Sequence, residues 1–129
     1  MIAPVQTALI LLALLQVKHL FADFFLQTPR MLMARGRFLH LGRLQHVALH
    51  AGLSLLIFLA LGVPLILSVV ICGIELLLHY VIDFLKGRHA ELTQYGPDDA
   101  GYWRAFGADQ LAHQLTYLAI IWGWAVFAT

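Results

Sequence analysis

Histidine and aspartate side chains recur at a spacing of four residues in four separate apolar stretches of the chain. The pairs are His19 with Asp23, His46 with His50, His79 with Asp83, and Asp109 with His113. Residues i and i+4 share one face of a helix, with Cβ atoms about 5–6 Å apart, so each pair can offer two ligands to one ion or to neighbouring ions. This spacing predicts a metal site built from several helices.

The donor types narrow the choice of metal. Mixed imidazole nitrogen and carboxylate oxygen suit a divalent zinc ion first, with iron and manganese as alternatives, and suit calcium or copper(I) poorly. The expected ligands are His19, His46, His50, His79, Asp83 and His113. These are more than one zinc ion needs, so the sequence leaves open a single ion with outer carboxylates or two ions side by side.

Other polar residues of the same stretches have expected roles around the metal. Asp23 and Asp109 are candidates for a general base, and Lys86 is a candidate contact for an anionic substrate such as a phosphate head group. A lysine at such a position more often extends to the membrane surface. Three further polar residues complete the set: Gln27, Glu75 and Gln110. The glutamines would bind a substrate or fix a carboxylate, with structural hydrogen bonding as their more common role. The glutamate would carry a proton or pair with another helix.

The elements that position these residues are membrane-spanning helices. Apolar residues make up 61% of the chain and charged residues 12%, against about 45–50% and about 25% in soluble domains. The four spans are expected at about 5–26, 44–61, 65–85 and 106–127, each long enough to cross a hydrocarbon core of about 30 Å. Thr28-Pro29 closes the first span, and Gly62-Val63-Pro64 makes the second and third an antiparallel hairpin. The expected fold is a single all-α domain over residues 1–129, an antiparallel bundle of four transmembrane helices.

The connections fix an expected orientation. Four arginines lie between the first two spans, and Lys86, Arg88 and Arg104 flank the polar linker before the last span. The positive-inside rule then places both connections in the cytoplasm and both termini outside, in a bacterial inner membrane. Residues 29–43 are expected either as a basic segment on the membrane surface or as a plain loop with arginine anchors. All four spacing-of-four pairs then fall at the cytoplasmic end.

Three sequence segments resemble a known family. His19-Leu-Phe-Ala-Asp23-Phe-Phe-Leu-Gln27, His79-Tyr-Val-Ile-Asp83-Phe-Leu-Lys86 and Asp109-Gln110-Leu-Ala-His113 are similar to the bacterial membrane family called domain of unknown function 3307. The resemblance covers nearly the whole chain and supports this choice of residues without implying a substrate. A looser similarity of pattern links the chain to membrane-bound metal-dependent hydrolases with HxxxD motifs, as an analogy only.

The expected function is metal-dependent hydrolysis of a lipid or other amphiphile at the cytoplasmic surface, with membrane lipids as partners. A redox di-iron enzyme is a variant of this hypothesis that two bound metals would favour. A net charge of +1 argues against a nucleic-acid partner, and a homo-oligomer stays open. The alternative is a non-enzymatic transporter, proton pathway or assembly module that uses the same residues, and a di-histidine haem bundle ranks last. Taken singly, each polar residue also has a structural interpretation, since interhelical hydrogen bonds contribute about 0.6 kcal/mol each.

Overall fold

The chain folds into helices joined by short connections. The computed structural model describes residues 4–33 and 36–127, and within these ranges it contains five α-helices and no strands. They are α1 (Pro4–Phe24), α2 (Pro29–Met33), α3 (Leu41–Ala60), α4 (Leu65–Thr93) and α5 (Ala100–Phe127). The predicted all-α class is confirmed.

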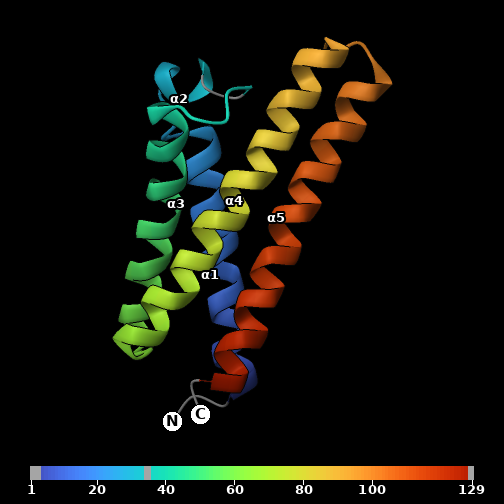
Figure 1. Ribbon diagram of the computed structural model, residues 1–129. Coiled ribbons are helices and arrows are strands. Elements are labelled where there is room, and N and C mark those ends of the chain that lie inside the picture. The colour runs from blue at the N-terminus through green and yellow to red at the C-terminus, as the bar shows by residue number, and fades with distance from the viewer. Residues whose placement is uncertain (1–3, 34–35, 128–129) are drawn as a thin grey trace.

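The four long helices pack in a closed ring. α1 contacts α3 and α5, and α4 also contacts α3 and α5, while the short α2 packs on α3. The start of α1, the end of α5 and the α3–α4 turn lie at one end of the molecule (Figure 1). α2 and the α4–α5 turn lie at the other end, which we call the α2 end. This arrangement brings residues late in α1 and α4 to the same level as residues early in α3 and α5.

Three of the described helices are long and apolar enough to cross a membrane: α1, α3 and α4. Many large apolar side chains on the outside of the ring are exposed, such as Leu9, Val69 and Leu118. Outward apolar surface of this extent is typical of protein that contacts lipid. The first half of α5 carries Asp109, His113 and other polar residues, and its predicted crossing of the membrane stays a prediction.

The apolar core fills the part of the ring nearer the α3–α4 turn. Leu11, Phe58, Ile71 and Ile120 are buried together there, one from each long helix. The buried side chains toward the α2 end are mostly polar or charged. The ring therefore has an apolar half and a polar half along its axis.

The helices on either side of the polar linker are longer than predicted. α4 continues to Thr93, eight residues beyond the expected span, and α5 starts at Ala100, six residues before it. Gln94, with φ of 53°, ends α4 in a left-handed conformation, so the linker shrinks to residues 94–99. Hydropathy locates only the apolar part of a helix, whereas backbone hydrogen bonding continues until a residue such as Gln94 caps it.

The segment before α3 folds back onto α4. The ring of Phe38 packs against Tyr80 and Phe84, and the Tyr80 hydroxyl donates to the backbone carbonyl of Phe38. Arg43, predicted as part of a surface segment, is instead 3% exposed and lies over the rings of Tyr80 and Phe84. The apolar stem and planar guanidinium of arginine allow this stacking. Arg35, another arginine of that prediction, lies outside the described residues.

Candidate metal centre

Five histidine rings, contributed by all four long helices, converge on three aspartates in the polar half of the ring. In each histidine, Nε2 lies within 3.5 Å of an aspartate oxygen. The residues that meet are His19, Asp23, His46, His50, His79, Asp83, Asp109 and His113. The spacing-of-four pairs therefore do come together, as the antiparallel order of the helices predicted.

Asp23, near the end of α1, gathers histidines from two helices. Its Oδ1 lies 2.9 Å from His50 Nε2 and 3.2 Å from His46 Nε2, both on α3. Its Oδ2 lies 3.1 Å from His19 Nε2, one turn earlier on α1. One carboxylate thus faces three imidazole nitrogens.

Asp83 of α4 plays the same part on the other side of the centre. Its Oδ2 lies 3.1 Å from His79 Nε2 and 3.3 Å from His46 Nε2, and its Oδ1 lies 3.2 Å from His113 Nε2. His46 therefore lies between Asp83 and Asp23. The two carboxylates and their histidines form one continuous cluster.

Two donor sets within the cluster have the geometry to hold a metal ion. Ligand atoms of Asp23, His46, His50 and His79 all lie within 4.8 Å of one another, and so do those of His79, Asp83 and His113. Ligands at about 2.0–2.1 Å from a tetrahedral zinc ion are about 3.3 Å apart, close to the nitrogen–oxygen distances of the cluster. His79 is common to both sets. Because one imidazole nitrogen binds one ion, assigning His79 to the second set leaves two histidines and one aspartate in each.

An unpaired atom at His79 supports a cation there. Its Nε2 is buried without a hydrogen-bond partner in the described part of the chain, although it lies 3.1 Å from Asp83 Oδ2. His79 Nε2 and Asp83 Oδ2 are thus close to each other without hydrogen-bond geometry, as expected for two ligands that face the same ion. Burying such a nitrogen with no partner is costly.

His19 belongs to neither donor set, so its predicted role as a ligand stays a prediction. Its Nδ1 lies 2.9 Å from the Tyr117 hydroxyl and its Nε2 lies 3.3 Å from Gln110 Oε1. Tyr117 is buried and was not among the predicted residues. Tyr117 follows His113 at the same spacing of four, so this spacing could have predicted that it faces the cluster.

Asp109 lies beside the second donor set and outside it. Its Oδ2 accepts hydrogen bonds from Lys86 Nζ at 2.7 Å and from Gln110 Nε2 at 3.2 Å. Its Oδ1 is buried without a hydrogen-bond partner in the described residues, 3.5 Å from His113 Nε2. Lys86 thus points into the protein toward Asp109, and one carboxylate oxygen is left facing the centre.

A buried ion pair lies on the other side of the cluster, nearer the apolar core. Lys18 of α1 forms it with Glu75 of α4, and both side chains are at most 5% exposed. Lys18 Nζ also donates to the backbone oxygen of His50 at 3.2 Å and lies 3.4 Å from Nδ1 of the same residue. Of the two roles open for Glu75, pairing with another helix is the one observed. Its partner Lys18 was missed.

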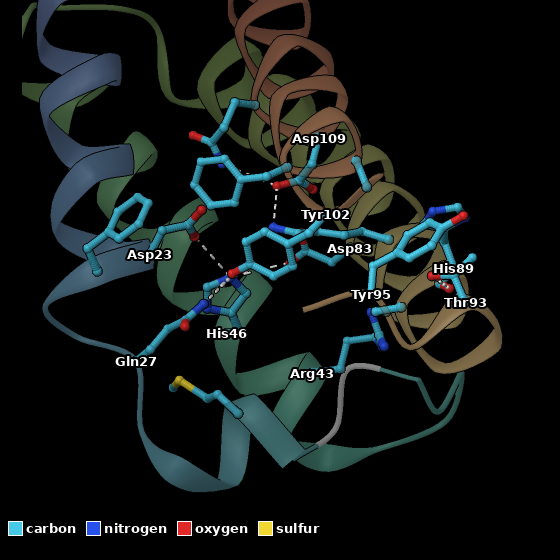
Figure 2. A pocket seen from close by; sticks show the side chains of 18 residues that line it. Asp23, Gln27, Arg43, His46, Asp83, His89, Thr93, Tyr95, Tyr102 and Asp109 are labelled. Carbon is cyan, nitrogen blue, oxygen red and sulfur yellow. Dashed lines mark hydrogen bonds and ion pairs between the residues drawn. The ribbon is translucent and has the colours of Figure 1, made fainter. Parts of the chain in front are cut away.

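A cavity of about 340 Å³ opens onto the cluster from the α2 end. Asp23, His46, Asp83 and Asp109 lie around it in Figure 2, with Lys86 also on its wall. Gln27, which follows the end of α1, lines it with Nε2 3.5 Å from His46 Nε2. A molecule in this cavity would reach both donor sets and Asp109.

The family model for a protein of unknown function (DUF3307) matches residues 10–129. The chain belongs to the DUF3307 family. Neither a curated protein nor a solved structure matches it.

The match places the whole candidate centre of this DUF3307 chain within the family region. The range includes both donor sets as well as Lys18, Glu75 and Asp109. The similarity of the three histidine-containing motifs to this family is thereby confirmed, while the looser likeness to membrane hydrolases stays a prediction. The DUF3307 description carries no reaction, so the chemistry must be argued from the site.

Proposed function

We propose that the protein is a membrane-embedded, metal-dependent hydrolase that binds two divalent ions and acts on a lipid or other amphiphile. The observation that carries this proposal is the pair of donor sets, each with two histidines and one aspartate, at the floor of an open cavity. Catalytic zinc sites commonly use three protein ligands and keep a further position for water or substrate.

With His79 assigned to the second set, the ligands of the first ion are Asp23, His46 and His50, and those of the second are His79, Asp83 and His113. His46 Nε2 lies 3.3 Å from Asp83 Oδ2, so the sets adjoin, as required for ions about 3.5–4 Å apart. Zinc is the first choice, and iron and manganese also accept these donors. Bound ions would polarise a phosphoryl or carbonyl oxygen and acidify water.

Asp109 is the best candidate for the general base. Lys86 and Gln110 fix one of its oxygens, and the other faces the centre without a partner. That oxygen can accept a proton from water while the hydroxyl adds to the substrate, and can return the proton to the departing oxygen. Asp23, the other predicted base, is better used as a ligand because it belongs to the first donor set.

We place this site at the cytoplasmic face of a bacterial inner membrane, with four crossings and both termini outside. The support is the concentration of arginine and lysine at the α2 end, where Arg30, Lys86 and Arg88 lie. The positive-inside rule gives such an end to the cytoplasm. A dimer in the membrane is compatible with this arrangement.

A non-enzymatic ion or proton pathway is the second candidate. The Lys18–Glu75 pair favours it, because it extends the polar network inward from the cluster. Beyond the pair, however, Leu11, Phe58 and Ile71 close the ring with a packed apolar core. An ion or proton that travelled to the opposite end would have to cross that core. The site is therefore open at one end only, which fits an enzyme better than a pathway.

The test is hydrolysis by metal-loaded protein. Liposomes of bacterial lipid extract would be incubated with the purified chain, and released phosphate, head groups and fatty acids measured. We expect turnover that a chelator abolishes and metal restores. Asp109→Asn should lower the rate by about 10²–10⁴-fold while keeping its metal, and the exposed turn variant Asp98→Asn should match wild type. Metal-loaded protein that releases none of these products refutes the hydrolase.

A further inference from the structure

Two cationic side chains line the cavity beside the metal centre. Lys86 of α4 holds Asp109 Oδ2 at 2.7 Å. An ammonium group has three protons, so this contact leaves Lys86 further donors for a ligand. Arg43 of α3 lies with its guanidinium 5.4 and 5.5 Å from the ring centroids of Tyr80 and Phe84, and its Nε donates to a backbone oxygen at 2.9 Å. These contacts hold the arginine in one orientation on the cavity wall.

Another part of the cavity wall is apolar. Phe24 of α1, Met31 of α2 and Phe106 of α5 line it. The rings of Phe24 and Phe106 lie 6.4 Å apart, and Lys86 Nζ lies 5.0 Å from the Phe106 centroid. Phe24 is the last residue of α1 and is 54% exposed. The charged and apolar parts of the wall are therefore in direct contact, and the apolar part reaches the outer surface of the ring at Phe24.

The charge of the cavity depends on the metal. With neutral histidines, Asp23, Asp83 and Asp109 outnumber Lys86 and Arg43, so the lining carries an excess of one negative charge. One divalent ion reverses this sign, and a second adds to the positive potential. The metal-loaded cavity, whose metal-bound histidines are neutral, therefore attracts an anion.

We propose that this cavity binds the phosphate head group of an anionic lipid, with Lys86 and Arg43 as its cationic contacts. The acyl part would lie along Phe24, Met31 and Phe106. The inference rests on the proposed function, since the ions supply the charge that admits the phosphate. It narrows the substrate from any amphiphile to one that carries phosphate next to its apolar chain.

The test measures binding of a short-chain phosphatidic acid phosphonate, which resists hydrolysis, to the full metal-loaded chain in detergent. Inorganic phosphate and a phosphatidylcholine of the same chain length are the comparison probes. We expect the phosphonate to bind at least about 10-fold more tightly than either. Lys86→Gln should weaken it about 10-fold or more, and Lys86→Arg should restore it. The matched control Arg88→Gln removes an exposed charge from the same helix outside the cavity and should stay within about twofold of wild type.

Equal losses in Lys86→Gln and Arg88→Gln, or equal binding of the phosphatidylcholine, overturn the proposal. If inorganic phosphate binds as tightly as the phosphonate, the acyl part contributes nothing. The site then binds free phosphate and not a lipid head group. Metal content is measured on the same samples. Loaded protein that does not bind the phosphonate refutes this inference alone, whereas protein that takes up no metal refutes the proposed function beneath it.

Discussion

Replacing Lys18 by methionine should destabilise the protein strongly, because the change strands a buried carboxylate. The side chains of Lys18 and Glu75 are 5% and 1% exposed, and the two form a direct ion pair between α1 and α4. Breaking a buried pair by removing one partner costs about 3–5 kcal/mol. The lost hydrogen bond to the His50 backbone oxygen adds about 1 kcal/mol. The free energy of unfolding of a protein is about 5–15 kcal/mol, so Lys18→Met would remove a large part of it.

The double variant Lys18→Met/Glu75→Leu separates the pair from its surroundings. With both partners apolar, the losses that remain are the contacts of Lys18 Nζ with the backbone oxygen and Nδ1 of His50, so we expect a cost of about 1–2 kcal/mol. The difference between the double variant and the sum of the single variants is the coupling energy of the pair. We expect it to exceed about 2 kcal/mol.

The assay is reversible unfolding in mixed micelles by titration with sodium dodecyl sulfate, followed by circular dichroism. The exposed pair of Arg88 and Glu91, whose side chains are 55% and 51% exposed, is the matched control and should show a coupling of about 0–1 kcal/mol. A Lys18–Glu75 coupling of only about 0.6 kcal/mol, the average for an interhelical hydrogen bond in a membrane protein, would mean that the buried charges are not strongly coupled. The same would follow if the free-energy changes of the two single variants simply add up to that of the double variant.

The metal centre and the orientation of the chain in the membrane can each be tested by substitution. His50→Ala and His113→Ala should each lower the bound metal from two ions to about one per chain, because each removes one ligand from a different donor set. Elemental mass spectrometry checks this, and loss of both ions in either variant would mean that the sets do not act separately. In a Cys72→Ser background, a membrane-impermeant maleimide added to intact cells should label Pro64→Cys at the α3–α4 turn but spare Asp98→Cys at the α2 end. The opposite labelling would reverse the orientation.

Much of the arrangement could be predicted from the sequence. The length of each apolar stretch located a helix, and the short Gly62-Val63-Pro64 turn predicted that α3 and α4 are antiparallel. With alternating helix directions, the spacing of four then required His19, His46 and His79 to meet at one end, and their ring centroids do lie close together. Such predictions depend only on the repeat of the helix and the order of the spans.

Other features depend on side-chain packing, which spacing does not determine. Lys18 precedes His19 by one residue, so it lies on a different face of α1, and only the packed ring reveals that this face meets Glu75. A charged residue inside an apolar span needs a partner, and Lys18 and Glu75 both lie inward of the cluster, so that signal was available. The burial of Arg43 had no such signal, because it depends on Phe38, Tyr80 and Phe84 meeting across the fold.

If these histidines and aspartates bind metal, the purified protein should contain it. Elemental mass spectrometry on detergent-purified protein, loaded and then dialysed, would compare wild type with His79→Ala and with His89→Ala. His79 is common to both donor sets, whereas His89 lies on the same helix, exposed and outside them. We predict about two ions of zinc, iron or manganese per chain in wild type and in His89→Ala, and one or none in folded His79→Ala. Metal-free wild type after reconstitution with each ion, or equal metal in all three proteins, would mean that the cluster is a hydrogen-bonded polar network and not a metal centre.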